Sequence, residues 1–292
     1  MGWEDAGPLD RSFSADERGR LRDADLTAYR GLYQAAAPVL QTGSVDIDGA
    51  LAIWNPHDED PSFNYFTGFE TVTDPDDAWH QAERAARDGG ARVFGVGLTA
   101  ERLAWGTPER LERLGLSYDS DEIVWAAHLA AGERSVPAPL PEGIELMSAG
   151  IDPTVFARVL NRGWEVPEGH GRGRLYAAAI GLPGWTHYLS LADGMPAGGS
   201  ALFSLAGVSI FMVAATDPRF RGRGVQTALI DRRRADAAAA GSDLLMTETV
   251  SGNASPRNFE RAGFVEIARR RIYATRLDGG NSGPRERPEN AR

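Results

Sequence analysis

The chain has 292 residues, enough for two ordinary domains, and its net charge of −10 comes from the first 140 residues, where 25 acidic residues outnumber 12 Arg. This acidic half argues against a protein that coats nucleic acid, whereas the remaining residues, with 16 acids and 19 Arg, could attract an anionic ligand. The absence of Cys and Lys excludes disulfides, Cys-ligated zinc and thiolate or lysine nucleophiles. The sequence also shows no metal-ligand spacing, signal peptide or membrane span. We therefore expect a cytoplasmic protein without a metal or a membrane contact.

The chain divides into two predicted domains. Residues 1–20 are polar and lack apolar periodicity, so we expect a flexible N-terminus before a first domain at 21–132. In the segment 133–141 three Pro alternate with other residues, which excludes a helix and predicts an extended linker. A second domain is expected at 142–278, and the Gly-, Pro- and charge-rich residues 279–292 are expected to be disordered.

The two domains carry an internal repeat at an offset of 148 residues. Residues 108–116 match residues 256–264, and residues 123–129 match residues 271–277 in their apolar pattern. Each copy reads as a short helix that ends at Gly, followed by an extended alternating segment. Because these features keep their register, we favour duplication over chance similarity.

The second domain has an α/β pattern. Asp152 and Pro153 form a helix start, and Asp193-Gly194 forms a hairpin turn. The order of expected elements is strand 142–148, helix 152–163, strands 185–191, 197–205 and 208–215, helix 224–240, strand 243–250, helix 255–262 and closing strands at 265–277.

A glycine-containing loop joins the strand 208–215 to the following helix. Gly222 and Gly224 allow the backbone to approach a bulky anion, and the peptide N–H groups at the helix start point toward one place. A diphosphate fits such a turn. A Walker A loop is excluded because Lys is absent, and a dinucleotide fingerprint is excluded because Thr227 stands at its third glycine.

In this context the motif R-x-x-G-x-G at Arg219, Gly222 and Gly224 resembles the acyl-CoA-binding motif of the GNAT superfamily of N-acyltransferases. The overlapping frame from Arg221 ends in Gln226, where the superfamily usually has a small residue. A second segment, 253–264, resembles the superfamily's later motif, an Asn and a short helix ending in Gly-Phe. The resemblance implies an α/β fold of two GNAT-like lobes, each with a mixed, mostly antiparallel central sheet flanked by helices.

The resemblance implies an acyl-CoA co-substrate, most simply acetyl-CoA, and no metal. Backbone N–H groups of the strand before the loop are expected to bind the pantetheine arm and the thioester. The residues expected to bind the carrier are Val213, Ala215, Arg219, Arg221, Gly222, Arg223, Gly224, Val225, Gln226, Asn253, Ser255 and Phe259.

The catalytic groups are less clearly indicated. Glu248 is the best-placed carboxylate for a general base, because it lies in an apolar strand; a salt-bridged or solvated Glu is an equal alternative. The superfamily's frequent thiolate acid is a Tyr, but its place is taken by Phe259. Either no acid is needed, or Ser255 or Tyr273 substitutes, or the donor is not an ordinary thioester.

The acceptor is expected to contact the Gly-rich segment 163–174. Its Trp164, Glu165 and His170 suit a mobile loop over a small-molecule primary amine, although an ordinary surface loop has the same composition. The Arg triplets at 232–234 and 269–271 are interpreted as solvated faces rather than nucleic-acid contacts.

The first domain lacks the anion loop. At the matching offset it has residues 71–76, without glycine and with acidic residues nearby, so it is interpreted as a degenerate GNAT-like copy. The function that we expect is acyl-CoA-dependent N-acylation of a small amine. The alternatives are an amide-forming transferase that uses aminoacyl-tRNA and a non-catalytic acyl-CoA sensor. Nothing in the sequence indicates an oligomeric state.

Overall fold

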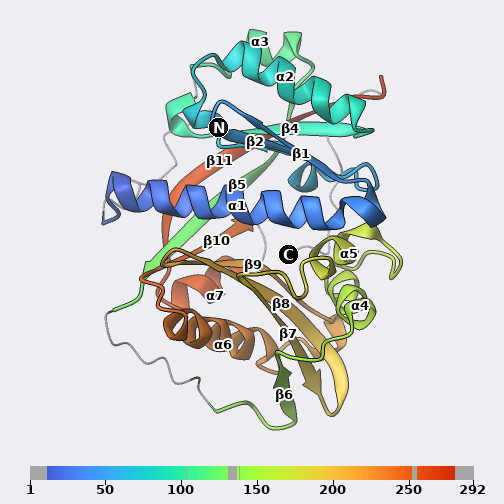
Figure 1. Ribbon diagram of the computed structural model, residues 1–292, viewed down its shortest axis with the longest axis vertical. Helices are drawn as coiled ribbons and strands as arrows, with labels where there is room; N and C mark the ends of the chain where they lie inside the picture. The colour runs from blue at the N-terminus through green and yellow to red at the C-terminus, as the bar shows by residue number, and fades with distance from the viewer. Residues whose placement is uncertain (1–11, 103, 131–136, 138, 252–254, 280–292) are drawn as a thin grey trace. The chain divides into compact units, whose positions relative to one another are not determined.

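The computed structural model describes residues 12–102, 104–130, 137, 139–251 and 255–279 (Figure 1). The described chain forms two compact units. Unit 1 contains residues up to 18, residues 29–125 and residues from 248 onward, and unit 2 contains residues 19–28 and 126–247. The terminal segments predicted to be flexible lie largely outside the described residues, as do most of the predicted linker and Asn253.

Unit 1 contains a mixed sheet. Its strand order is β1 (Gly43–Ile47), β2 (Ala50–Trp54), β3 (Tyr65–Thr67), β4 (Val93–Leu98), β11 (Val265–Arg276) and β5 (Ser117–His128), whose last three residues belong to unit 2. β3 and β4 are parallel, whereas β1–β2, β2–β3 and β4–β11 are antiparallel. The last strand of the chain therefore pairs with a strand of the first half.

Helices of unit 1 follow the sequence signals. α2 (Pro75–Asp88) starts at Pro75, after Asp74 accepts hydrogen bonds from two backbone N–H groups of its first turn. Its buried face carries Trp79, which stacks on Phe94 of β4 with 5.6 Å between ring centroids. The other helices are α3 (Pro108–Arg113), α7 (Ser255–Arg261), the short 3-10 turns Pro61–Phe63, Phe69–Thr71 and Ala100–Arg102, and α1 (Ala15–Leu40), which both units share.

The strands of unit 2 also include parallel and antiparallel pairs. Its strand order is β10 (Leu244–Val250, with the last three residues in unit 1), β9 (Val208–Thr216), β8 (Met195–Leu205), β7 (Trp185–Ala192) and β6 (Ile144–Met147). Only the β9–β10 pair is parallel. The helices are α4 (Pro153–Gly163), α5 (Gly171–Ala177) and α6 (Val225–Ala239), with a 3-10 turn at Pro218–Phe220.

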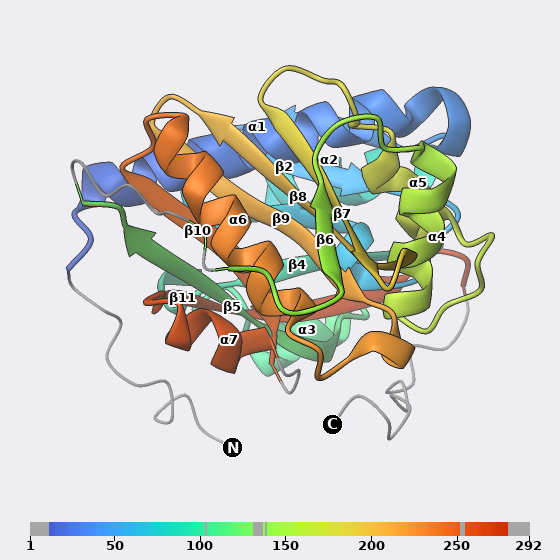
Figure 2. The ribbon, with the colours of Figure 1, turned by 90° about the horizontal axis from the view of Figure 1, so that it is seen from below.

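Two adjacent glycines of β8 show how helices cover this sheet (Figure 2). A Cβ on Gly198 would lie 2.8 Å from Val225 of α6, and one on Gly199 would lie 3.1 Å from Phe156 of α4. Successive strand residues point to opposite faces, so α6 and α4 pack on opposite faces of the sheet. Glycine at these positions lets both helices approach closely.

The predicted α/β class with mixed, mostly antiparallel sheets is confirmed. One local prediction is wrong: the segment 163–174 is not a loop throughout, because α5 begins at Gly171 and His170 caps it through Nδ1. A Cβ on Gly173 of α5 would lie 2.2 Å from the carbonyl oxygen of Ala157, so this helix rests directly on α4. Among the described residues no helix is both long and apolar enough to cross a membrane.

Candidate functional site

The loop between β9 and α6 takes the conformation that its glycines permit. Gly222 and Gly224 have φ values of 76° and 81°, which L-residues with a Cβ rarely adopt. Gly224 is the N-cap of α6 and has no side chain to accept a hydrogen bond from the first turn. The backbone N–H groups of Val225 and Gln226 therefore lie at a helix N-terminus, where the partial positive charge favours an anion.

The three Arg of this loop are each held by a carboxylate of unit 2, with nitrogen–oxygen distances of 2.7 to 2.8 Å. The pairs are Arg219–Asp217, Arg221–Glu165 and Arg223–Asp193. All three Arg side chains are one-third or more exposed, so each pair contributes little to stability. The three pairs tie the loop to Asp217, Glu165 and Asp193.

Asp217 is the buried anchor of the loop, with 2% of its surface exposed. Its Oδ1 accepts hydrogen bonds from the backbone N–H and the Nε of Arg219, at 3.0 and 3.1 Å. These hydrogen bonds from Arg219 lower the pKa of the Asp217 carboxyl, which stays ionised. The adjacent Phe220 ring packs beneath the guanidinium groups of Arg219 and Arg223.

The strand before the loop has an irregularity. Within unit 2, its parallel ladder pairs Val208–Phe211 with Leu244–Thr247 of β10. Its register with β8 shifts by one residue. Leu202 pairs with Phe211, but Ala201 pairs with Val213, so Met212 forms a bulge. Val213 and Ala215, two of the predicted carrier-binding residues, follow this bulge and have buried side chains.

Glu248, the predicted base, belongs to a buried ionic cluster in unit 1. Its Oε1 lies 2.8 Å from Nη1 of Arg270, and Tyr29 donates a hydrogen bond to its Oε2 at 3.0 Å. The same Nη1 lies 2.9 Å from Oε2 of Glu122. Each of the three charged side chains is only 10 or 11% exposed. The structure therefore shows Glu248 in a salt bridge rather than at a solvated edge.

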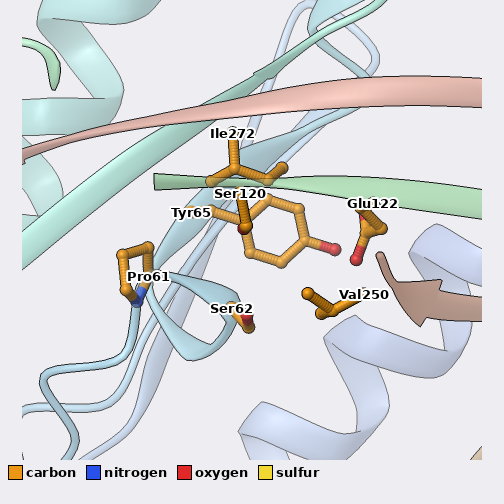
Figure 3. A pocket seen from close by; sticks show the side chains of 7 residues that line it. All are labelled: Pro61, Ser62, Tyr65, Ser120, Glu122, Val250 and Ile272. Carbon is orange, nitrogen blue, oxygen red and sulfur yellow. The ribbon is translucent and has the colours of Figure 1, made fainter. Parts of the chain in front are cut away.

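Glu122 (Figure 3) is a buried ionisable residue that the sequence interpretation did not single out. Burial, reinforced by the neighbouring Glu248 carboxylate, raises its pKa to about 8, although Arg270 acts in the opposite direction. A signal was present: Arg270 alternates with the apolar Ile272 and Ala274, which places a charge on the inward face of a strand. Glu122 stands at the matching position of the other copy.

The remaining predicted catalytic and carrier-binding residues lie in unit 1. Phe259 is buried in α7 and meets Phe264 edge to face at 5.3 Å. Tyr273 lies in β11 opposite Val96 and contacts the ring of Tyr118. Ser255 is the first residue of α7.

The predicted acceptor residues lie in unit 2 and have structural partners. Trp164 is half-buried, and its ring lies 5.9 Å from that of Tyr176. Glu165 is paired with Arg221, and His170 caps α5. The structure thus brings Glu165 to the anion loop, while Trp164 packs inward.

The interpretation of both Arg triplets as solvated faces is wrong for their central residues. Arg233 and Arg270 are 0% and 8% exposed. Arg233 donates hydrogen bonds to the carbonyl oxygens of Leu229 and Val213, and its guanidinium lies 4.4 Å from the centroid of the Phe211 ring. Neither triplet is a continuous basic surface.

The segment of the first half that matches the anion loop differs from it at the helix start. The helix start of α2 is occupied by the Asp74 carboxylate, which accepts hydrogen bonds from the N–H groups of Asp76 and Asp77 at 3.1 Å. A carboxylate from the chain itself thus takes the place that an anionic ligand would need.

Comparisons with known proteins establish the fold. No protein-family model matches the sequence, and no curated protein matches it. A GCN5-related N-acetyltransferase from Kribbella flavida is similar in structure, with a TM-score of 0.59, 16% identity and coverage of 90% of this chain and 96% of that one. A similar protein from Sphaerobacter thermophilus has a TM-score of 0.56 at 16% identity and covers 80 and 82%.

A tandem GNAT protein from the clavulanic acid biosynthesis pathway is also similar. It has a TM-score of 0.54 and 15% identity, and the alignment covers 94% of this chain and 98% of that one. At these identities the likeness concerns the fold. The chain has the fold of the GNAT superfamily in its tandem arrangement, as the sequence motifs predicted.

Proposed function

We propose that the protein is an acyltransferase that moves an acyl group, most simply acetyl, from acyl-CoA to the primary amine of a small molecule. One observation carries the proposal. The start of α6, which has no side-chain cap and lies behind Gly222 and Gly224, directly follows a strand that bulges at Met212. These features would bind a diphosphate and the pantetheine arm attached to it. Known N-acetyltransferases share this fold.

In this proposal each part of the carrier has its own partners. The backbone N–H groups of residues 222–226 hold the diphosphate, and the side chain of Asp217 keeps their loop in place. The N–H groups of residues 212–215 face the arm and the thioester carbonyl, and they stabilise negative charge on that oxygen during transfer. Asn253, Ser255 and Phe259 are proposed as partners of the arm from the sequence motif alone. When bound, acyl-CoA supplies the activated acyl thioester.

The chain supplies proton transfer and acceptor binding. Glu248 receives the proton that the attacking amine loses, directly or through water, while its own geometry is fixed by Arg270 and Tyr29. Ser255, or after it Tyr273, protonates the departing thiolate. Trp164, Glu165 and His170 border the acceptor.

Calorimetric titration with acetyl-CoA tests the proposal. We expect micromolar binding to the unaltered protein and at least a tenfold loss in the double variant Gly222→Val/Gly224→Val. Gly181→Val is the matched control for Gly222→Val, because both glycines have a left-handed φ, 86° and 76°, and open space at the Cβ position, but Gly181 lies outside the loop; a Cβ at Gly224 would lie 2.8 Å from Pro141. It should share the backbone strain and keep the affinity.

The outcome also separates the alternatives. Binding followed by transfer to an amine, detected as free CoA thiol, supports the acyltransferase. Binding without turnover across a panel of primary amines favours a sensor. No binding of acetyl-CoA would contradict both and favour a donor such as aminoacyl-tRNA on the same fold.

A further inference from the structure

Arg233 of α6 is a buried cation that has no counter-ion among the residues that the structure describes. It is 0% exposed, and the ionisable side chain that acts on its charge is Tyr188 of β7. The Tyr188 hydroxyl donates to Asp236 at 2.8 Å, and Asp236 is paired with Arg232 at 3.0 Å, so that carboxylate already has its cation. Burial lowers the pKa of Arg233 to about 9, which leaves it charged at pH 7.

The guanidinium group of Arg233 lies against the strand whose N–H groups are proposed to face the thioester. α6 packs against β9 (Figure 2), and Nη1 of Arg233 donates a long hydrogen bond, 3.4 Å, to the carbonyl oxygen of Val213. The guanidinium carbon lies 4.4 Å from the centroid of the Phe211 ring. Nη2 has no hydrogen-bond partner among the described residues. A buried cation with so few partners is costly, which indicates a role other than stabilising the fold.

The Val213 carbonyl belongs to the same peptide group as the N–H of Ala214. The N–H of Asp217 donates to the carbonyl oxygen of Ala197 in β8 at 2.9 Å, and the pairing of β9 with β8 is regular between the bulge and this bond. N–H groups alternate between the two edges of a strand, so the N–H of Ala214, three residues earlier, points away from β8. The carbonyl and the N–H of a trans peptide point in opposite directions. Arg233 and the Ala214 N–H therefore lie at opposite ends of one peptide dipole.

A cation at the carbonyl end of a peptide strengthens the N–H donor at its other end. Hydrogen bonds in series polarise one another, and the effect is larger where water is excluded. In the proposed transfer the amine nitrogen bonds to the acyl carbon, and negative charge develops on the thioester oxygen. The carbon–sulfur bond then breaks, and its electron pair leaves with the sulfur. An N–H donor aimed at the developing charge lowers the barrier, and a stronger donor lowers it further.

The position of β9 does not depend on Arg233 alone. The Thr247 hydroxyl of β10 donates to the carbonyl oxygen of Phe211 at 3.0 Å, and β9 pairs with β8 from Val208 to Thr216. Removal of the guanidinium should therefore change the strength of the donor without displacing the strand.

We propose that Arg233 is a positioning residue for acyl transfer. It holds and polarises the Val213–Ala214 peptide, so that the Ala214 N–H donates to the thioester oxygen as negative charge develops there. This role rests on the proposed function and adds to it one named donor and the charge behind that donor.

The test is infrared difference spectroscopy of acetyl-CoA that carries a carbon-13 label at the thioester carbonyl, bound to the full chain. A hydrogen bond to the carbonyl oxygen lowers its stretching frequency, so the bound label should absorb at a lower frequency than the free one. In Arg233→Met this shift should fall by about half or more. The calorimetric Kd for acetyl-CoA should stay within about threefold, because residues 222–226 hold the diphosphate.

Turnover gives a second measurement on the same samples. Release of free CoA thiol is followed with the primary amine that gives the fastest reaction in the unaltered protein. In Arg233→Met we expect kcat and kcat/KM to fall together by about tenfold or more, since the lost interaction strengthens in the transition state. Arg232→Met is the matched control, because it makes the same change at the neighbouring residue, whose charge is paired with Asp236. It should leave the frequency shift and kcat unaltered.

Two further variants separate the charge from the hydrogen bond. Arg233→Lys keeps a cation only while its ammonium group holds a proton, and burial lowers the pKa of a lysine. Its frequency shift should therefore approach that of the unaltered protein as the pH is lowered from 8 to 6, whereas uncharged Arg233→Gln should show no such trend. Tyr188 and Asp236 are present in both variants and cannot cause the difference. If Arg233→Met does not fold, this comparison decides the matter.

The outcomes distinguish this role from the proposed function. An unchanged carbonyl frequency in Arg233→Met, in a protein that binds acetyl-CoA and transfers its acyl group, overturns the role of Arg233 alone. A loss of acetyl-CoA affinity as large as the loss of kcat also overturns it, because Arg233 would then only support the fold of the site. Binding without turnover, with a shift that depends on Arg233, refutes the transferase and keeps the contact with Ala214. Failure of the unaltered protein to bind acetyl-CoA overturns both.

Discussion

Glu122 and Arg270 stand at matching positions of the two copies of the repeat, 148 residues apart, and are ion-pair partners at 2.9 Å. β5 and β11, the closing strands of the two halves, are neighbours in the sheet order of unit 1. In the predicted repeat, one copy thus carries the acid and the other the Arg, and Arg270 also pairs with Glu248 at 2.8 Å.

Removal of the guanidinium from this cluster should be strongly destabilising. Arg270→Met leaves Glu122 and Glu248 buried without a cation, and we expect the free energy of unfolding to fall by about 3–5 kcal/mol. Urea unfolding at pH 7 measures this change. The triple variant with Glu122→Gln and Glu248→Gln should recover part of the loss, and the exposed Arg113→Met should change stability by under about 0.5 kcal/mol. A loss below about 1 kcal/mol in Arg270→Met would contradict this account.

Glu122 should make stability fall as the pH rises. Its pKa is about 8 in the folded protein against a reference value of 4.5, so the folded state holds a proton that the unfolded state has lost. This contribution to stability is complete below pH 4.5 and disappears as the pH passes through 8. Urea unfolding at pH 5, 6.5 and 8 should show the decline in the unaltered protein and a flatter profile in Glu122→Gln. A profile that the substitution leaves unchanged would assign the decline to other groups.

Arg233 should behave differently from Arg270, although both are buried. Among the described residues no carboxylate pairs with Arg233, and burial lowers its pKa to about 9. Arg233→Met exchanges a desolvated charge for an apolar chain of similar length beside Phe211, so stability should stay within about 1 kcal/mol or increase. Thermal and urea unfolding measure the effect. A loss above about 3 kcal/mol would show that this guanidinium makes a favourable interaction beyond the hydrogen bonds to Leu229 and Val213.

Loss of the Asp217 side chain should weaken acetyl-CoA binding more than loss of an exposed carboxylate that pairs with the loop. Asp217→Ala removes the hydrogen bonds to Arg219 and should weaken acetyl-CoA binding roughly tenfold, as expected for the loss of about 1.4 kcal/mol of loop preorganisation. Asp193→Ala is the matched control. Its ion pair with Arg223 is exposed, so the loss should stay under about fivefold. Equal effects in calorimetry would mean that charge, rather than loop geometry, controls binding.

The sequence predicted the parts of the site that depend on local patterns. The strand before the loop, the left-handed glycines and the following helix are coded within residues 208–240, and the structure forms them there. The role of Arg270 was not predictable from the triplet, because a run of Arg resembles a solvated face. Strand partners were not predictable either, since the alternating pattern of β11 suits any sheet and does not specify β4.

A crystal structure of the complex with acetyl-CoA tests most directly whether the backbone N–H groups behind Gly222 and Gly224 hold the diphosphate. We expect the diphosphate oxygens within hydrogen-bonding distance of the N–H groups of residues 222–226, and the thioester beside residues 212–215. A diphosphate held elsewhere, with the start of α6 unoccupied, would contradict this binding mode.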